Sequence, residues 1–170
     1  NIEEDHLDFF KDLEDIRHSF HQFASLLPPD GTLVINSNIQ NYEEICDGLN
    51  CSVITYGSSP DSNYSAQNIS YDDKGCVSFD LLRNGTPAEH VVLSVTGDHN
   101  VSNALASIAV AELLGVPADM IQKGLISFSG TDRRFEYKGT LNGTTIVDDY
   151  AHHPTEIAAT LKAAKHYPHE

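Results

Sequence analysis

Residues 31–57 read GTLVINSNIQNYEEICDGLNCSVITYG, and this stretch decides the fold class. Two apolar runs, 33–35 and 52–57, are bounded by Gly, Asn and Ser, as buried strands often are. Residues 41–49 between them favour a short helix that ends at Gly48. A strand, a helix and a second strand in this order predict a βαβ unit, and therefore an α/β fold with a parallel sheet.

An amphipathic helix is predicted before this unit. Its apolar side chains recur at steps of three and four, which places them on one helical face: Leu13, Ile16, Phe20, Phe23 and Leu27. Pro28 and Pro29 then end the pattern.

The residues after the βαβ unit change character twice. Residues 64–95 hold three short segments with partial alternation, separated by KG and NGTP, which predict a three-stranded antiparallel meander. An alanine-rich helix over 100–115 and a second helix over 117–128 are predicted next. The polar run SGTDRR at 129–134 is the candidate domain boundary.

Beyond that boundary we expect a hairpin and a helix. The pair Asn142-Gly143 is typical of a tight turn, and it separates the strand segments 135–140 and 144–149. From Pro154 onward the residues favour a helix.

Composition excludes some classes of function. The net charge of the 170 residues is −15, with 25 acidic against 10 basic side chains, which disfavours partners such as nucleic acid or an anionic membrane. No apolar run approaches the ~20 residues that span a bilayer. Three cysteines in no zinc pattern favour reduced thiols and a cytoplasmic location. The chain starts without Met, and its last residues, HYPHE, leave a predicted helix with nothing after it, so we expect a piece of a longer protein, with N-terminal and C-terminal portions missing.

Two polar clusters lie in the first two thirds of the chain. In NIEEDH, at residues 1–6, His6 and nearby carboxylates could hold a divalent metal, or the acidic residues could cap the following helix. In TGDHNVSN, at 96–103, Asn100 and Asn103 lie three apart and share one helical face. Their amides could bind the edge of a base, or one could cap the helix.

Two further clusters follow the predicted boundary. In TDRRFE, at 131–136, adjacent arginines in a strand would point to opposite faces, so one could reach the phosphate groups in a cleft. A surface ion pair is the alternative. In VDDYAHHPTE, at 147–156, Asp149 could bind a ribose hydroxyl, and His152 or His153 could face substrate or metal. Helix capping in a solvated loop is the alternative here.

In this order, NIEEDH, GDHNVSNALA, GTDRRFE and VDDYAHHPTE resemble the Mur ligase family over essentially the whole chain. The resemblance implies the distal part of a central ATPase domain at 1–129, a mixed sheet with helices and an antiparallel meander. It also implies the start of a Rossmann-like C-terminal domain at 130–170. The phosphate-binding motif G-x-x-x-x-G-K-[ST] is absent from these residues and would lie outside this piece.

The resemblance also implies an activity. It is closest to the family member that joins L-alanine to UDP-N-acetylmuramate at the expense of ATP, an early step of peptidoglycan synthesis. The substrate carboxylate attacks the γ-phosphate to give an acyl phosphate, and the amine of alanine then displaces phosphate. This chemistry depends on positioning and on neutralising phosphate charge.

Residue roles follow from the match to the family motifs. On the nucleotide side, Asn100 and Asn103 would contact adenine, Asp149 would hold the ribose, and Arg134 would act as a catalytic group at the phosphates.

On the substrate side, Tyr150 and His152 would face the muramoyl group and alanine, with His152 also catalytic. His6 would be a ligand of Mg2+. Some relatives carry a carbamylated lysine on the helix after the DH motif, but residues 17–23 read RHSFHQF. The missing lysine fits the alanine-adding member.

Three alternatives stay open. One is the ligase of the same family that attaches a preformed murein peptide during recycling. Another is a metal-dependent hydrolase, which would bring His6, Asp149, His152 and His153 within metal-ligand distance. The third is a nucleotide-binding domain without turnover. We expect the ligase to place the His6 loop and the Asp149 loop on opposite sides of one cleft.

Overall fold

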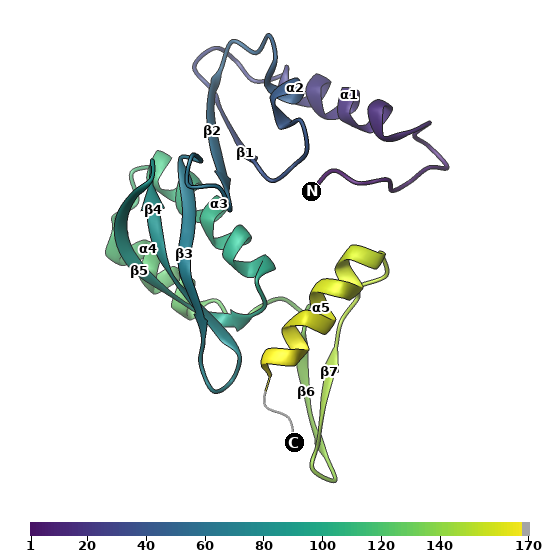
Figure 1. Cartoon of the computed structure of the whole chain (residues 1–170), viewed down its shortest axis with the longest axis vertical. Helices are drawn as coiled ribbons and strands as arrows, with labels where there is room; N and C mark the ends of the chain where they lie inside the picture. The colour runs from purple at the N-terminus through teal and green to yellow at the C-terminus, as the bar shows by residue number, and fades with distance from the viewer. Residues whose placement is uncertain (168–170) are drawn as a thin grey trace.

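The computed structural model describes residues 1–167 and contains a five-stranded mixed sheet (Figure 1). Strands β1 (Thr32–Asn36) and β2 (Ser52–Gly57) pair in parallel, with α2 (Tyr42–Cys46) between them along the chain. The predicted βαβ unit is therefore confirmed.

The predicted meander is confirmed as well. Strands β3 (Tyr64–Tyr71), β4 (Cys76–Arg83) and β5 (Thr86–Thr96) are antiparallel neighbours. β3 joins β2 in parallel through only two residue pairs, so that the strand order is β1-β2-β3-β4-β5.

The main core lies between the meander and α3 (His99–Leu113). Alternate residues of a strand share one face, and on β4 Val77, Phe79 and Leu81 form the buried face, with Leu82 buried as well. Leu105 and Ile108 of α3 pack against that face. Burial of each of these side chains stabilises the folded state by about 1.5–3 kcal/mol relative to leaving it exposed. This packing holds the first turn of α3 at the end of β5.

Of the two remaining helices of this part of the chain, one packs against α2 and the other against β5. α1 (Leu13–Ala24) starts at Asp12, whose carboxylate accepts a hydrogen bond from the Asp15 N–H at 3.0 Å. It ends at Ala24, three residues before Leu27. The next residue, Ser25, donates a hydrogen bond from its hydroxyl to the His21 carbonyl. α4 (Ala118–Ser127) lies along β5, and Ser94 of that strand donates to the Ile126 carbonyl. No helix within residues 1–167 has the length and apolar character needed to cross a membrane.

A separate hairpin and helix follow. Strands β6 (Glu136–Leu141) and β7 (Thr144–Asp148) are antiparallel, and Asn142 and Gly143 between them both have positive φ. This backbone geometry suits a two-residue hairpin, so the predicted turn is confirmed. α5 (Pro154–His166) runs beside the hairpin, and its other side faces the five-stranded sheet unit (Figure 1).

One local prediction is wrong. Arg133 and Arg134 were expected in a strand, but β6 begins only at Glu136, and both arginines lie in the preceding turn. Arg133 and Phe135 have φ of 61° and 47°. The Phe135 N–H donates to the Asp149 carboxylate at 2.9 Å. Because the Phe135 N–H is bound to a side chain, it does not pair with a neighbouring strand. The strand β6 therefore starts after Phe135.

Candidate functional site

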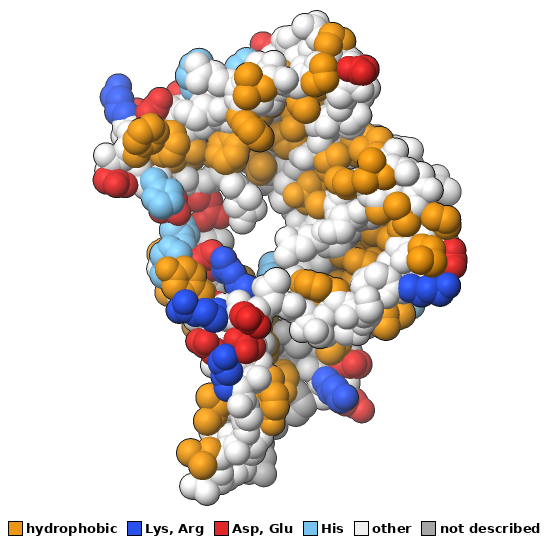
Figure 2. Space-filling model, turned by 180° about the vertical axis from the view of Figure 1, so that it is seen from behind, with side chains coloured by type: hydrophobic (Ala, Val, Ile, Leu, Met, Phe, Trp, Pro, Cys, Tyr) orange, Lys and Arg blue, Asp and Glu red, His pale blue; other side chains and the backbone are white. Residues whose placement is uncertain are grey.

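A pocket of about 930 Å3 lies where the N-terminal segment, the start of α3, the turn before β6 and the start of α5 meet. This volume is typical of ligand sites. Figure 2 shows an opening between the upper and lower parts of the molecule, with His, acidic and basic side chains gathered along one edge. Glu3 and Asp5 line the pocket on one side, and Asp149 and His152 line it on another.

Five of the seven predicted site residues line this pocket: Asn100, Asn103, Arg134, Asp149 and His152. His6 and Tyr150 are not among the lining residues. Segments that are far apart in the sequence therefore converge as the ligase hypothesis expects, and two predicted residues stay at or outside the rim.

Asn100 and Asn103 are linked to each other. Asn103 Nδ2 donates to Asn100 Oδ1 at 3.0 Å, which confirms that the two side chains share a helical face. Asn100 Nδ2 in turn donates to the Thr96 carbonyl at 2.8 Å. Beside them is an apolar hollow of about 230 Å3, whose walls include Leu93 and Phe128. Apolar walls with amides at the edge suit a planar base.

Asp149 is held by the chain itself. Its Oδ1 accepts from Ala151 N at 2.7 Å, and its Oδ2 accepts from Phe135 N at 2.9 Å and Thr160 Oγ1 at 3.1 Å. A carboxylate has about four acceptor positions, so about one remains for a ligand hydroxyl. Asp149 thus joins the turn before β6 to α5, in addition to facing the pocket.

The two arginines diverge from the turn. The guanidinium of Arg133 lies 4.4 Å from the centre of the Tyr150 ring, outside the pocket. Arg134 reaches the pocket, and its Nη1 lies 3.3 Å from Glu156 Oε1. The pKa of Glu156 is lowered, first by the backbone N–H groups of His152 and His153 and then by Arg134. Arg134 is therefore a cation at the pocket, and the partly buried carboxylate of Glu156 is its partner.

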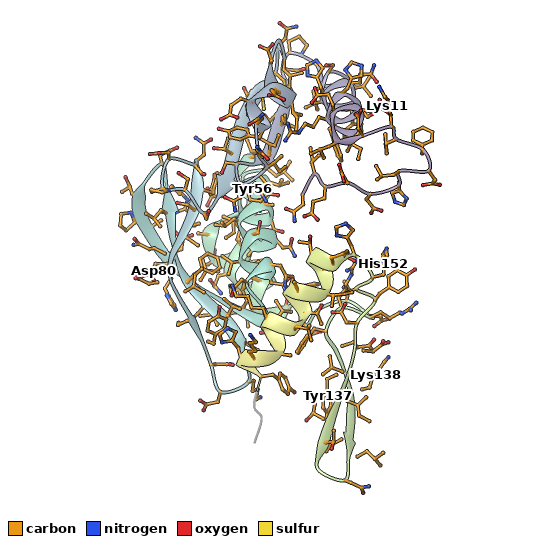
Figure 3. All side chains as sticks on the ribbon, turned by 45° about the vertical axis from the view of Figure 1, so that its right-hand side comes forward. Lys11, Tyr56, Asp80, Tyr137, Lys138 and His152 are labelled. Atoms are coloured by element: carbon orange, nitrogen blue, oxygen red, sulfur yellow. The ribbon has the colours of Figure 1, made fainter. Side chains whose placement is uncertain are left out.

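The neighbouring histidines differ in role. His152 is exposed beside the start of α5, on the side that faces the N-terminal segment (Figure 3). His153 caps α5: its Nδ1 lies 3.4 Å from Thr155 N, and also 3.3 Å from Glu3 Oε2. Capping requires Nδ1 to accept, whereas the ion pair requires it to carry a proton. The two contacts are therefore alternatives, and the second links the N-terminal segment to α5.

His6 and Tyr150 are solvent-facing. The His6 side chain is 75% exposed, with Asp5 at 3.8 Å as its partner. Tyr150 is 52% exposed and packs edge-on against the His152 ring. Within residues 1–167, no three His, Cys, Asp or Glu side chains are placed to hold a metal ion. The convergence that the hydrolase alternative requires is not present in this part of the chain.

His21, near the place where the resemblance implies a lysine in some relatives, has a structural partner. Its Nδ1 lies 3.1 Å from the Ile45 carbonyl, so the ring binds α2.

Sequence reasoning missed His99. It is the first residue of α3, it lines the pocket, and its Nε2 lies 3.2 Å from Asn100 Nδ2. Desolvation by the surrounding protein lowers the pKa of His99, although Asp149 and Asp98 oppose that change. Its position beside Asn100 in GDHN was the available signal, because a side chain at a helix start is close enough to orient the amide of the next residue.

Asp98 was missed as well. Its carboxylate accepts from Tyr71 Oη and from Lys162 Nζ, and therefore joins the sheet unit to α5. Partial burial alone would raise the pKa of Asp98, but the hydrogen bonds from Lys162 and Tyr71 outweigh it and lower the pKa. Burial and the bond to Asp98 raise the pKa of Tyr71 to about 12.

Comparison with protein families agrees with this arrangement. Residues 1–111 match the Mur ligase middle domain, and residues 133–170 match the Mur ligase, glutamate ligase domain. The chain belongs to the Mur ligase family. The predicted boundary between residues 129 and 130 falls in the interval that neither match covers, and it stays a prediction.

Individual relatives are similar over the whole chain. A UDP-N-acetylmuramate–L-alanine ligase from Lachnospira eligens is 56% identical over 170 residues, which cover 99% of this chain and 37% of that relative. The chain thus spans little more than a third of the curated relatives it matches.

Solved structures show the same similarity. The UDP-N-acetylmuramate–alanine ligase MurC from Thermotoga maritima has a TM-score of 0.76 and 28% identity, over 95% of this chain and 36% of that chain. The UDP-N-acetylmuramate:L-alanyl-gamma-D-glutamyl-meso-diaminopimelate ligase from Neisseria meningitides has a TM-score of 0.65 and 32% identity. This second match covers 77% of this chain and 39% of that one.

Proposed function

We propose that this chain is part of a cytoplasmic, ATP-dependent ligase that joins L-alanine to UDP-N-acetylmuramate through an acyl phosphate, in peptidoglycan precursor synthesis. One observation carries the proposal: a single pocket collects five residues that the family resemblance assigns to one reaction, from Asn100 at one end to His152 at the other. The 56% identity to an alanine ligase over the whole chain supports the same amino acid.

In this proposal the nucleotide lies between the two parts of the chain. The base enters the apolar hollow beside Asn103, and Asp149 offers its remaining acceptor position to the ribose. Arg134 is then the guanidinium available for phosphate oxygens, which it can bind bidentately. Fixed positive charge at the transferring phosphoryl group is the main source of acceleration in such reactions.

The acceptor side lies toward His152. We assign His152 and Tyr150 to the muramoyl substrate and alanine. His152 lines the pocket, and Tyr150 packs on its ring from outside. Tyr150 would then act at the rim, where the longer substrate leaves the pocket.

Magnesium fits the N-terminal side of the pocket. Mg2+ is usually held by one or two carboxylates, several waters and substrate phosphates, and does not need a cage of protein ligands. Asp5 lines the pocket and lies 3.8 Å from His6, so these two residues would hold the ion together with waters and phosphate oxygens. When bound, it would offset phosphate charge.

An assay of the full-length protein that contains this chain tests the proposal. With UDP-N-acetylmuramate, ATP and Mg2+, we expect phosphate release that depends on free L-alanine and is not supported by a preformed L-alanyl peptide. Release with the peptide alone would assign the recycling ligase, to whose Neisseria member the chain is 32% identical. Release with neither would contradict both assignments.

A further inference from the structure

The amide of Asn100 is fully engaged by the chain. One of its two N–H groups points to the Thr96 carbonyl at 2.8 Å, and the other faces His99 Nε2 at 3.2 Å. A carbonyl oxygen can only accept, so the contact with Thr96 decides which end of the Asn100 amide is nitrogen. Asn100 therefore has no free N–H for a ligand.

The orientation of Asn103 follows from that of Asn100. Asn100 Oδ1 can only accept, and so Asn103 must turn its Nδ2 toward it, at 3.0 Å. Asn103 then keeps one N–H and its whole Oδ1. Within residues 1–167, no donor binds that Oδ1. Asn103 lines the apolar hollow.

A free N–H beside a free Oδ1 matches one kind of base edge. An asparagine amide binds adenine in two places, because its oxygen accepts from the 6-amino group and its N–H donates to the ring nitrogen N7. A base with oxygen at position 6 presents two acceptors there, so its oxygen would face Asn103 Oδ1. Turning the Asn103 amide over would bring its oxygen against Asn100 Oδ1.

His99 disfavours a joint rotation of the two asparagine amides. If Asn100 turned over together with Asn103, its oxygen would face two acceptors, the Thr96 carbonyl and His99 Nε2. The ring of His99 is held over Gly97, where an added Cβ would lie 2.7 Å from Cε1 and 2.9 Å from Nδ1. The glycine therefore leaves the space in which the ring can present Nε2 to Asn100.

We propose that His99 is a positioning residue for base selection: as the second acceptor for Asn100, beside the Thr96 carbonyl, it strengthens the orientation of both amides that favours a 6-amino purine over a 6-oxo purine. The inference rests on the proposed function in that it takes the pocket as a nucleotide site. It adds a division of labour, in which Asn103 contacts the base while Asn100 and His99 orient it.

Calorimetric binding of ADP and of inosine diphosphate, with Mg2+, to the full-length protein tests the inference without requiring turnover. We expect the wild type to prefer ADP. His99→Phe keeps a ring but removes the acceptor, and one hydrogen bond corresponds to a loss of that preference by about fivefold to tenfold. His99→Gln, whose Oε1 can replace Nε2 as the acceptor, should keep most of the preference.

His90→Phe is the matched control, since His90 lies on β5 and is not among the pocket residues, with Asp80 as its partner at 2.7 Å. It should leave the preference unchanged. A wild type that binds both nucleotides equally, or an unchanged preference in His99→Phe, would overturn the inference and leave the ATP site intact. Equal loss in His99→Phe and His99→Gln would assign the effect to packing and also overturn it. No binding of either nucleotide would overturn the proposed function together with the inference.

Should His99→Phe not fold, His99→Asn gives the same test, because its shorter amide does not reach the Nε2 position. A retained preference in that variant would overturn the inference, and a lost one would support it.

Discussion

At the scale of single residues, the pocket depends on side chains whose polar atoms are already used by the chain. Asp149 accepts three hydrogen bonds from residues of the turn, the loop and α5. Asn100 is bound at Thr96, His99 and Asn103. Groups held in this way cost little reorganisation when a ligand arrives. Substitution of these residues would break the same hydrogen bonds and destabilise the pocket.

Protonation of His99 should weaken nucleotide binding. The neutral ring accepts from Asn100, whereas a protonated ring would turn a donor toward another donor. The pKa of His99 lies below its ordinary value of 6.5, first because of desolvation. Arg134 lowers it further, and Asp149 and Asp98 act in the opposite direction. The neutral form therefore persists somewhat below pH 6.5, and binding is lost only as the pH falls through the lowered pKa.

Titration of ADP affinity from pH 8 to pH 5 checks this expectation. We expect the wild type to lose more affinity toward acid pH than His99→Gln, which cannot gain a proton there. The phosphate groups of ADP titrate equally in both measurements and cancel in the comparison. An identical acid loss in the two proteins would contradict the role of His99.

At the scale of elements, α5 is fastened to the sheet unit at one end and to the N-terminal segment at the other. Near its C-terminal end, Lys162 binds Asp98, and the His166 ring stacks on Tyr71 at 3.9 Å. Between them Ala163 is 1% exposed. At the N-terminal end, His153 lies 3.3 Å from Glu3. The helix therefore contacts both the sheet unit and the N-terminal segment.

Lys162→Ala should loosen this contact. The Lys162 side chain is 62% exposed, so its ion pair contributes no more than about 1 kcal/mol. We expect roughly twofold to fivefold faster amide hydrogen exchange over residues 154–166 of the full-length protein. Lys165→Ala, on an exposed position of the same helix, is the control and should leave exchange unchanged. Equal exchange in the two variants would show that the ion pair does not hold the helix.

At the scale of the whole molecule, the pocket exists only because distant segments meet. Glu3 and His152 line one cavity although the chain between them forms the entire five-stranded sheet. The expectation that the N-terminal loop and the Asp149 loop face one cleft is therefore met at Glu3 and Asp5, while His6 stays exposed beside them. Under the proposed function, a nucleotide that contacts both sides of this cleft would couple its binding to the distance between them.

We expect the isolated 170 residues to show no ligase activity. They hold five candidate site residues in one pocket but no G-x-x-x-x-G-K-[ST] sequence for the phosphates, and they span 37% of their relatives. The measurement is phosphate release with UDP-N-acetylmuramate, ATP, Mg2+ and L-alanine, compared with the full-length protein. Alanine-dependent release from the short chain would refute the expectation.

The sequence by itself determined the elements and the kinds of chemistry. Periodicity and the Asn142-Gly143 turn act over a few residues, so the helices, the meander and the hairpin could be predicted from local pattern. The end of α1 at Ala24, before the predicted stop at Pro28, could not. The motifs likewise identified Asn100, Asn103 and Arg134. Only the tertiary structure decided which atoms of these residues remain free.

Contacts between residues that are distant in the sequence determine which of these atoms remain free. Asp149 accepts a hydrogen bond from Phe135 N, so β6 starts later than predicted. The Tyr150 ring packs against Arg133 outside the pocket. Asp98 binds Lys162, which lies 64 positions further along the chain. No local pattern encodes such contacts, because they depend on how finished elements pack. The sequence therefore named the groups of the site, and packing determined which of them face the pocket.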